Sequence, residues 1–218
     1  MIKNLFLCFL SLTLLSCKND YHKIKELNYL ALGDSYTIGE SLEPGDSFPF
    51  QLKNKIDKIK DVKIIAKTGW TTGELIDTLN SLEIQNKYNF VSLLIGVNNQ
   101  YRKYDISLFE KEFEVLLNKA ISYSKDINKV FVLSIPDYGV TPFGSKDKNQ
   151  IRNEINLYNQ IKKRITRSYD IDFYDITDIS RDAELNKLLI AGDSLHPSKK
   201  MYSQWVDKIY RDLELKTD

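Results

Sequence analysis

Apolar residues along the chain follow two alternating patterns. In short runs they are almost continuous and stop at glycine or another turn residue, which is typical of buried strands. In longer segments they recur every three or four positions, which is typical of amphipathic helices. Five strands are predicted, at residues 27–32, 62–66, 90–95, 130–135 and 171–174. Five helices are predicted, at residues 47–59, 71–79, 107–121, 149–169 and 198–213.

The alternation of strands and helices predicts an α/β fold. Strands joined by helical crossovers run parallel, and a parallel sheet is covered by helices on both faces. We therefore expect one domain with a central parallel sheet of about five strands. Ligands of such sheets bind beyond the carboxyl ends of the strands, so candidate chemistry is sought in the segments that follow them.

Capping patterns predict two of the helix starts. Thr71 with Glu74, and Ser107 with Glu110, are each spaced as a capping box, in which the two side chains bind free amides of the first turn. Residues 33–45 and 136–148 are predicted to be loops, because glycine, serine and proline interrupt the pattern there.

The first residues of the chain have the character of a targeting segment. Lys3 precedes an apolar run at residues 5–15, which is too short to span a bilayer comfortably. The run ends at Leu14-Leu15-Ser16-Cys17, which resembles the lipobox of bacterial lipoproteins, where the leader is cut before a cysteine that then carries lipid. The alternatives are an ordinary secretory leader with a chance cysteine, or an uncleaved anchor.

This resemblance predicts three parts in the chain: a signal peptide at 1–16, the lipidated Cys17 with a short tether at 17–26, and a folded domain at 27–218. It implies an extracytoplasmic, membrane-anchored bacterial lipoprotein, at the periplasmic face or the cell surface. A lipid anchor with more than one acyl chain holds a protein durably at a membrane.

Charge and cysteine content narrow the possible partners. The 218 residues include 31 basic and 30 acidic side chains, a balance that argues against a nucleic-acid partner. Cys8 lies in the leader and Cys17 would carry lipid, so the folded domain has no thiol for a disulfide, a metal or catalysis. Its stability must come from its core.

Ser35 is the first candidate for chemistry. The apolar first strand stops at Gly33-Asp34-Ser35, which would place a hydroxyl at the edge of the sheet. A serine hydroxyl is a weak nucleophile at neutral pH, so it needs a base and a group that orients the base. His22 lies in the tether, which leaves His196 as the one candidate base, and Asp193 precedes it by three residues. Asp193 is therefore the candidate orienting group.

A nucleophilic serine also needs donors for the oxyanion that forms on the attacked carbonyl. The backbone amides of Ser35 and Gly69 and the side-chain amide of Asn98 all follow predicted strands, and they are the candidates. Aromatic residues at the same edge are candidates for lining a substrate pocket, although packing explains them equally well: Trp70, Tyr101 and Phe143.

The residues with this chemistry lie in four short motifs: Gly33-Asp34-Ser35, Gly69, Gly96-Val97-Asn98 and Asp193-Ser194-Leu195-His196. In order and spacing, these motifs resemble the four signature blocks of the SGNH (GDSL-type) hydrolases over essentially the whole of 27–218. The resemblance implies a flavodoxin-like three-layer α/β/α sandwich and no metal or organic cofactor. It also implies a Ser35–His196–Asp193 triad and an oxyanion hole built by Ser35, Gly69 and Asn98.

Two positions depart from the pattern of the family. Asn99 stands where the third block commonly has aspartate, and Tyr36 stands where leucine is common in the first block. Neither change removes a catalytic group, but the change at Asn99 indicates different bonding within its loop. Taken singly, each motif has an ordinary explanation as a turn or a capped helix start. An acid, a base, a nucleophile and an amide at one edge are harder to explain in that way.

The sequence therefore predicts a serine ester hydrolase that acts on carboxylic esters through an acyl-enzyme. A carbohydrate O-acetyl esterase is the alternative, and a surface-binding lipoprotein without catalysis is a third hypothesis. The expected partners are a small-molecule or glycan ester substrate and a membrane, reached through the anchor at Cys17.

Overall fold

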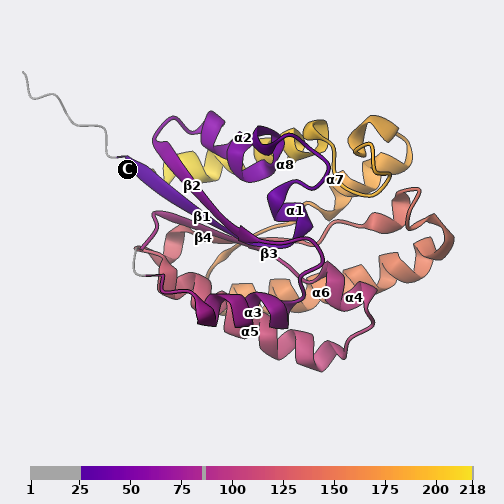
Figure 1. Cartoon of the computed structure of the whole chain (residues 1–218), viewed down its shortest axis with the longest axis horizontal. Helices are drawn as coiled ribbons and strands as arrows, with labels where there is room; N and C mark the ends of the chain where they lie inside the picture. The colour runs from indigo at the N-terminus through magenta and orange to yellow at the C-terminus, as the bar shows by residue number, and fades with distance from the viewer. Residues whose placement is uncertain (1–25, 85–86, 218) are drawn as a thin grey trace, which may run out of the picture.

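Five parallel strands form one sheet in the order β2-β1-β3-β4-β5 (Figure 1). The computed structural model describes residues 26–84 and 87–217. The five-stranded parallel sheet predicted from the sequence is confirmed. Its members are β1 (Leu27–Gly33), β2 (Ile59–Ala66), β3 (Phe90–Leu94), β4 (Val130–Leu133) and β5 (Asp172–Tyr174).

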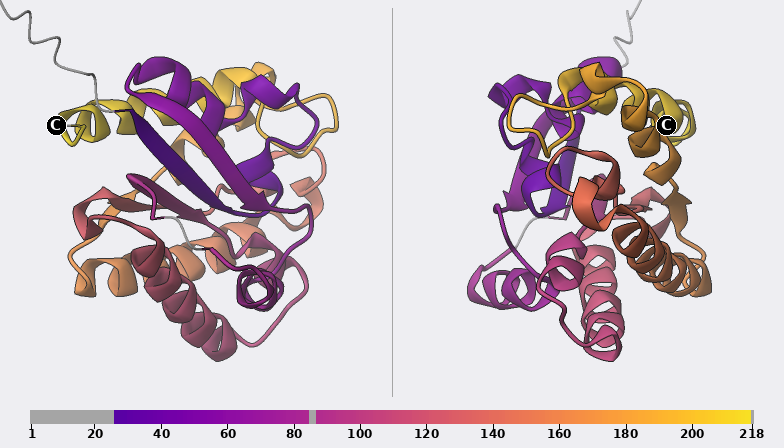
Figure 2. Two further views of the ribbon diagram at one scale, coloured as in Figure 1. Left: turned by 60° about the vertical axis from the view of Figure 1, so that its left-hand side comes forward. Right: turned by 90° about the vertical axis from the view of Figure 1, so that its right-hand side faces the viewer.

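Helices cover both faces of the sheet and give three layers (Figures 1 and 2). One face carries α2 (Phe48–Lys55) and α8 (Lys199–Leu215). The other carries α3 (Thr72–Ser81), α5 (Ile106–Tyr123) and α6 (Lys148–Ser168). Because helices lie on both sides, β1, β3 and β4 are apolar and buried along almost their whole length.

The layer of α2 and α8 is held by an aromatic cluster. Phe48, Tyr202 and Trp205 are fully buried. The rings of Tyr202 and Trp205 meet edge to face with their centroids 4.8 Å apart, and Phe48 lies 6.3 Å from each. Edge-to-face contacts of this kind are favourable beyond the apolar area that they bury. The cluster fixes the C-terminal helix beside the segment that follows β1.

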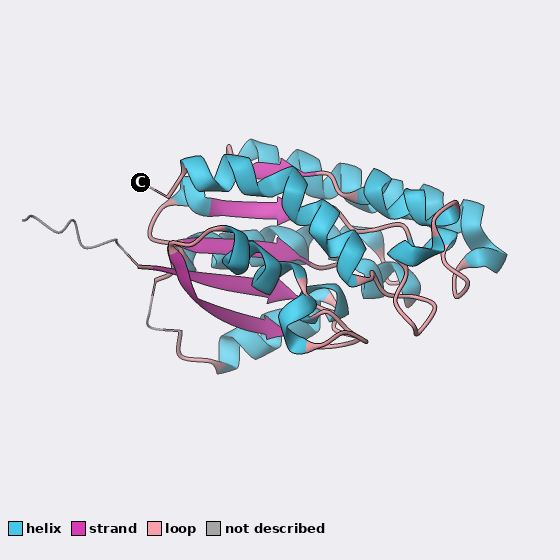
Figure 3. Cartoon of the chain, turned by 90° about the horizontal axis from the view of Figure 1, so that it is seen from above, coloured by secondary structure: helices cyan, strands magenta, loops and turns pink. Residues whose placement is uncertain are grey.

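All five strands point the same way, and the loops that follow them gather at one end of the domain (Figure 3). The tightest approach is at the end of β1. A Cβ atom on Gly33 would lie 2.1 Å from Thr37 Oγ1 and 2.2 Å from the backbone oxygen of Leu94. Only glycine fits there, so the chain can turn sharply from β1 across the end of β3.

Two predicted boundaries are wrong for identifiable reasons. The helix predicted at 47–59 ends at Lys55, because Ile59 already pairs with Leu27 as the first residue of β2. The capping box at Ser107 and Glu110 is not formed, because Asp105 is the N-cap and accepts from the Ser107 amide. The box at Thr71 and Glu74 is present.

Three short helices that follow strands were not predicted from the sequence. The helix α1 (Ser35–Ile38) follows β1, α4 (Val97–Tyr101) follows β3, and α7 (Thr177–Arg181) follows β5. Each has only four or five residues, too few to show a helical period. Two of them carry predicted site residues.

The predicted signal peptide, Cys17 and all of the tether except Glu26 lie outside the described residues. Within residues 26–84 and 87–217, no helix combines the length and the apolar character that crossing a bilayer requires.

Candidate active site

Ser35 is the first residue of α1, directly after the turn that ends β1. Asp34 caps this helix, and its Oδ1 accepts a hydrogen bond of 3.0 Å from the Tyr36 amide. Gly39 ends the helix with a φ of +80°, a left-handed conformation that favours glycine. A strand, a tight turn and one turn of helix therefore hold the Ser35 hydroxyl at the carboxyl edge of the sheet.

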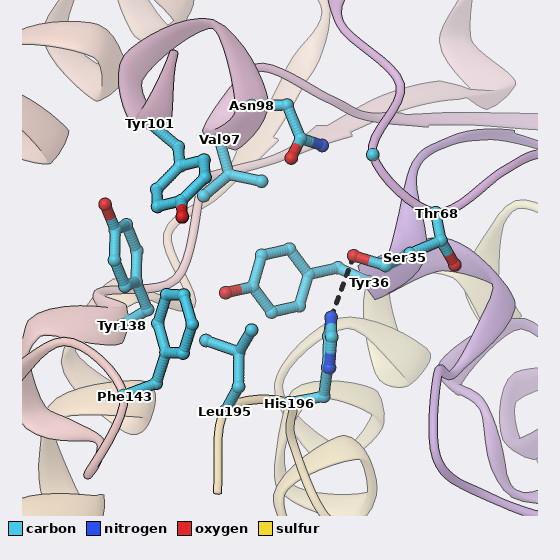
Figure 4. A pocket seen from close by; sticks show the side chains of 11 residues that line it. Ser35, Tyr36, Thr68, Val97, Asn98, Tyr101, Tyr138, Phe143, Leu195 and His196 are labelled. Atoms are coloured by element: carbon cyan, nitrogen blue, oxygen red, sulfur yellow. Dashed lines mark hydrogen bonds between the residues drawn. The ribbon is translucent and has the colours of Figure 1, made fainter. Parts of the chain in front are cut away.

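His196 reaches Ser35 from the opposite end of the chain. The distance from His196 Nε2 to Ser35 Oγ is 2.9 Å (Figure 4). On the other side of the ring, Nδ1 lies 2.5 Å from Asp193 Oδ2. His196 and Ser35 are 8% and 5% exposed. The three side chains form a hydroxyl–imidazole–carboxylate chain in the order that nucleophilic catalysis by serine requires.

The turn from Asp193 to His196 is built around the aspartate. Asp193 Oδ1 accepts from the backbone amides of Leu195 and His196, each at 3.0 Å. Ser194 takes a left-handed φ of 67°, which closes the turn. Partial burial alone would raise the pKa of Asp193, but hydrogen bonds from Ser41, the His196 ring and these amides outweigh it and hold that pKa well below its usual range. The carboxylate is therefore ionised beside the imidazole.

Ser41 is a site residue that the sequence analysis missed. Its hydroxyl donates to Asp193 Oδ2 at 2.6 Å, across 152 positions of the chain. It is one of several serines in a loop, and nothing in its sequence context distinguishes it. Its place beside Asp193 depends on how the loop after α1 meets the segment before α8.

Gly69 and Asn98 lie on the loops that follow β2 and β3, and both line the same cavity as Ser35 and His196. Gly69 has a φ of +84°, which requires glycine. Asn98 Nδ2 donates to the Trp70 backbone oxygen at 2.9 Å. An amide nitrogen has two protons, so this bond orients the group and leaves a second N–H for a ligand oxygen.

Asn99, which departs from the pattern of the family, ties two loops together. Its Oδ1 accepts from the Thr72 amide at 3.0 Å, and its Nδ2 donates to the Thr72 hydroxyl at 2.6 Å. Asn99 is fully buried. An amide suits this place, because one end must accept and the other must donate. The pair fastens α4 to the start of α3.

The cavity above Ser35 has a volume of about 150 Å³ and is mostly apolar. Figure 4 shows Ser35 and His196 on one side of it and a group of aromatic rings on the other. Trp70 does not line it, contrary to the prediction, because its ring packs against the core. The lining residues are Ser35, Tyr36, Thr68, Gly69, Val97, Asn98, Tyr101, Tyr138, Phe143, Leu195 and His196.

A second, more polar cavity of about 320 Å³ adjoins the first. Tyr101, Tyr138 and Phe143 line both cavities, and their ring centroids lie 5.9 to 6.4 Å apart. The polar side chains around the second cavity are Gln100, Lys103, Asp147, Gln150 and Glu154. In residues 26–84 and 87–217, no three His, Cys, Asp or Glu side chains are grouped as a metal site would need.

Comparison with known proteins assigns the chain to a family. Residues 31–204 match the GDSL-like lipase/acylhydrolase family, and the chain belongs to it. Among curated proteins, an acetylxylan esterase of Geobacillus stearothermophilus is 26% identical over 128 residues, which cover 53% of this chain and 54% of that protein. The match thus spans about half the length of the curated relative.

Solved structures share the fold at low sequence identity. A lipase/acylhydrolase from Enterococcus faecalis has a TM-score of 0.68 at 18% identity, over 87% of this chain and 96% of its own. A psychrotrophic esterase from Pseudoalteromonas sp. has a TM-score of 0.65 at 18% identity, over 87% and 98%. An acetylxylan esterase from Geobacillus stearothermophilus has a TM-score of 0.62 at 18% identity, over 89% and 96%.

The hydrogen bond from Ser41 can be tested by titration. Ser41→Ala should move the pKa of Asp193 upward, toward its usual range, because one of the donors that stabilise the carboxylate is lost. The measurement is a carbon-13 NMR titration of the Asp193 carboxyl group. Ser122→Ala is the control, since that hydroxyl bonds only to its own helix at Lys119. An unchanged Asp193 titration in Ser41→Ala would contradict the assignment.

Proposed function

We propose that this chain is a serine ester hydrolase that cleaves carboxylic esters through an acyl-enzyme. The observation that carries the proposal is the 2.9 Å approach of His196 Nε2 to Ser35 Oγ, while Nδ1 is held by Asp193 at the floor of a cavity. Membership of the GDSL-like lipase/acylhydrolase family supports the same reaction class.

In the first half of the reaction, Ser35 Oγ attacks the ester carbonyl carbon and its proton passes to His196 Nε2. Asp193 stabilises the imidazolium that results. The tetrahedral intermediate collapses when the bond to the alcohol oxygen breaks, and His196 returns the proton to that oxygen. In the second half, water replaces the alcohol, attacks the acyl-Ser35 ester with His196 as base, and releases the carboxylic acid.

The negative charge of each tetrahedral intermediate falls on the former carbonyl oxygen. We assign its stabilisation to the backbone amides of Ser35 and Gly69 and to the second N–H of Asn98. Ser35 lies at the start of a helix, where the amides of the first turn have no partner within the helix. Donors fixed before the substrate arrives stabilise the developing charge without reorganisation.

Loss of the nucleophile or the base should abolish turnover. We expect Ser35→Ala and His196→Ala each to lower kcat on p-nitrophenyl acetate by at least about 10³-fold, with the far-UV circular dichroism unchanged. Ser81→Ala, at the exposed end of α3, should keep full activity. Retained turnover in either site variant would refute the mechanism.

Labelling with a fluorophosphonate probe separates catalysis from simple binding. The parent chain should be labelled at Ser35, because the probe reacts with an activated serine, and Ser35→Ala should remain unlabelled. A folded parent chain that takes up no label would favour the third hypothesis, a surface-binding protein without catalysis.

A carbohydrate O-acetyl esterase is the second candidate, and the polar cavity favours it. The cavity beside Ser35 is small and apolar, which suits a short acyl group, whereas its polar neighbour suits an alcohol rich in hydroxyls. Sugars are bound by amide and carboxylate groups and by aromatic rings, and all three are present. Gln150 donates to Glu154 at 2.8 Å on this wall. The acetylxylan esterase that matches half of the chain is consistent with such a substrate.

A substrate panel distinguishes the two candidates. For p-nitrophenyl esters, kcat/KM should fall at least about tenfold from acetyl to octanoyl, because the longer chain exceeds the small cavity. If the alcohol is a sugar, Gln150→Ala should lower kcat/KM on acetylated xylooligosaccharides and leave p-nitrophenyl acetate unaffected. Gln160→Ala, on the same helix but away from both cavities, is the control. Equal effects of Gln150→Ala on both substrates would contradict the sugar hypothesis.

We also propose that the protein is an extracytoplasmic lipoprotein anchored through Cys17. The support is the sequence alone: a charged start, a short apolar run and the lipobox-like Leu14-Leu15-Ser16-Cys17. On phase separation in Triton X-114, the full chain expressed in a bacterium should enter the detergent phase, and Cys17→Ala should not be lipidated. Equal partitioning of the two, with no lipid mass on Cys17, would contradict the anchor.

A further inference from the structure

Lys162 is a lysine in the centre of the hydrophobic core. It lies on the inner face of α6, in line with Ile155, Tyr158 and Ile165, and its side chain is fully buried. Residues at this position of an amphipathic helix are usually apolar, because they face the core. A buried ammonium is costly unless it is paired and hydrogen-bonded, so its contacts indicate what it does.

The ammonium of Lys162 binds the two central strands at the point where they end. Nζ donates to the backbone oxygen of Leu133 at 2.8 Å and to that of Ile95 at 3.1 Å. It also lies 5.5 Å from the centre of the Phe113 ring. Leu133 is the last residue of β4, and Ile95 directly follows β3. Lys162 therefore holds the place from which the loop with Asn98 departs.

The opposite charge in this region is Asp34, the residue before the nucleophile. Its Oδ1 binds the Tyr36 amide, while Oδ2 is buried and has no hydrogen-bond partner within residues 26–84 and 87–217. Burial raises the pKa of Asp34 and lowers that of Lys162, and the attraction between the two opposes both shifts. The Gly96 amide lies close enough to Asp34 to favour its charged form as well.

Lys162 holds one end of the Ile95–Gly96 peptide group. The oxygen of Ile95 accepts from Lys162 Nζ at 3.1 Å, and the N–H of Gly96 belongs to the same peptide bond and points in the opposite direction. Rotation of this peptide would break the hydrogen bond to Lys162 and leave the buried ammonium with one acceptor fewer.

The clamped peptide leads into the proposed oxyanion hole. Gly96 has a φ of 123° and is the N-cap of α4, whose second residue is Asn98. Its lack of a side chain is required, because a Cβ atom would lie 2.6 Å from the Phe109 ring. Glycine alone allows many backbone conformations here, so the peptide before Gly96 and the contact of Asn99 with Thr72 together fix the direction in which α4 leaves the sheet.

We propose that Lys162 is a positioning residue for the ester hydrolase reaction: by binding the oxygens of Ile95 and Leu133 it clamps the Ile95–Gly96 peptide and so aims the Asn98 amide at the oxyanion. This inference rests on the proposed function, in which Asn98 is an oxyanion donor. Lys162 does not touch the substrate, and its effect passes through the backbone of residues 95–98.

Kinetics on p-nitrophenyl acetate test the clamp with Lys162→Met, which keeps the length of the side chain and removes its charge and its donors. We expect kcat to fall about 10- to 100-fold with KM changed less than about twofold, because the oxyanion forms only in the transition state. Lys163→Met, one position along the same helix and partly exposed, should retain the parent kcat.

A double-mutant cycle separates positioning from general damage. In the parent chain, Asn98→Ala should lower kcat about 10²- to 10³-fold, as loss of an oxyanion donor does. In the Lys162→Met background the further loss should be at least about tenfold smaller, because Asn98 is already misplaced. In the Lys163→Met background the full loss should remain. Fully multiplicative losses with Lys162→Met, or an effect on KM alone, would overturn the proposal.

Three further outcomes are decisive. If Lys162→Met does not fold, the cycle is run with Lys162→Gln, whose shorter amide keeps a donor without the charge; failure of both variants to fold would overturn the proposal by assigning Lys162 to stability alone. If Asn98→Ala has no effect in the parent chain, the oxyanion assignment under the proposed function fails, and the clamp fails with it. If Asn98→Ala has its full effect in every background, only the clamp fails.

Discussion

The hydrogen bond between His196 and Ser35 joins residues 161 positions apart, and much of the domain is arranged so that they meet. Ser35 is held at the end of β1, next to the central strand β3. The segment with Asp193 and His196 is held by α8, which packs on α2 through the cluster of Phe48, Tyr202 and Trp205. A second hydrogen bond, from Ser41 to Asp193, also joins the segment after β1 to the segment before α8. A small shift of α8 would therefore change the position of the His196 imidazole relative to Ser35.

The carboxyl edge of the sheet is stiffened by buried polar groups from the surrounding helices and loops. Asn159 binds both the amide and the oxygen of Ile135. Asn99 joins α4 to α3 by binding the amide and the hydroxyl of Thr72. Asp137 is buried and accepts from Arg181 at 2.9 Å beside the turn that carries Tyr138. Each of these buried side chains has hydrogen-bond partners, and the bonds form only when the partners are accurately placed. Loops anchored in this way can present side chains with the accuracy that catalysis needs.

The sequence was most informative where residue type and periodicity agree. The strands at 27–32, 90–95 and 130–135 could be predicted because each is a short apolar run, and Ser35, Asp193 and His196 could be singled out because the chain has one histidine beyond the tether. Boundaries were less predictable: Ile56 and Ile59 suit a helix face as well as a turn and a strand, and pairing with β1 decides between them. Asp105 replaced Ser107 as a cap through a difference of two positions.

The residues that could not be foreseen are those whose meaning depends on distant contacts. Ser41 is an ordinary loop serine until the segment before α8 approaches it. On α6, the apolar Ile161 is only partly buried, whereas its neighbour Lys162 is fully buried. A sequence pattern assigns a lysine to solvent, and only the carbonyl oxygens of two strand ends explain why this one is buried.

The direction of β1 has a consequence for how the protein meets its surroundings. Glu26 and Ser35 lie at opposite ends of the same strand, whose seven residues span about 23 Å at the usual rise of 3.3 Å per residue. Any attachment through the N-terminus therefore joins the domain at the end of β1 that is remote from Ser35. With the proposed anchor at Cys17, the chain would lead from the lipid into the end of β1 opposite to Ser35.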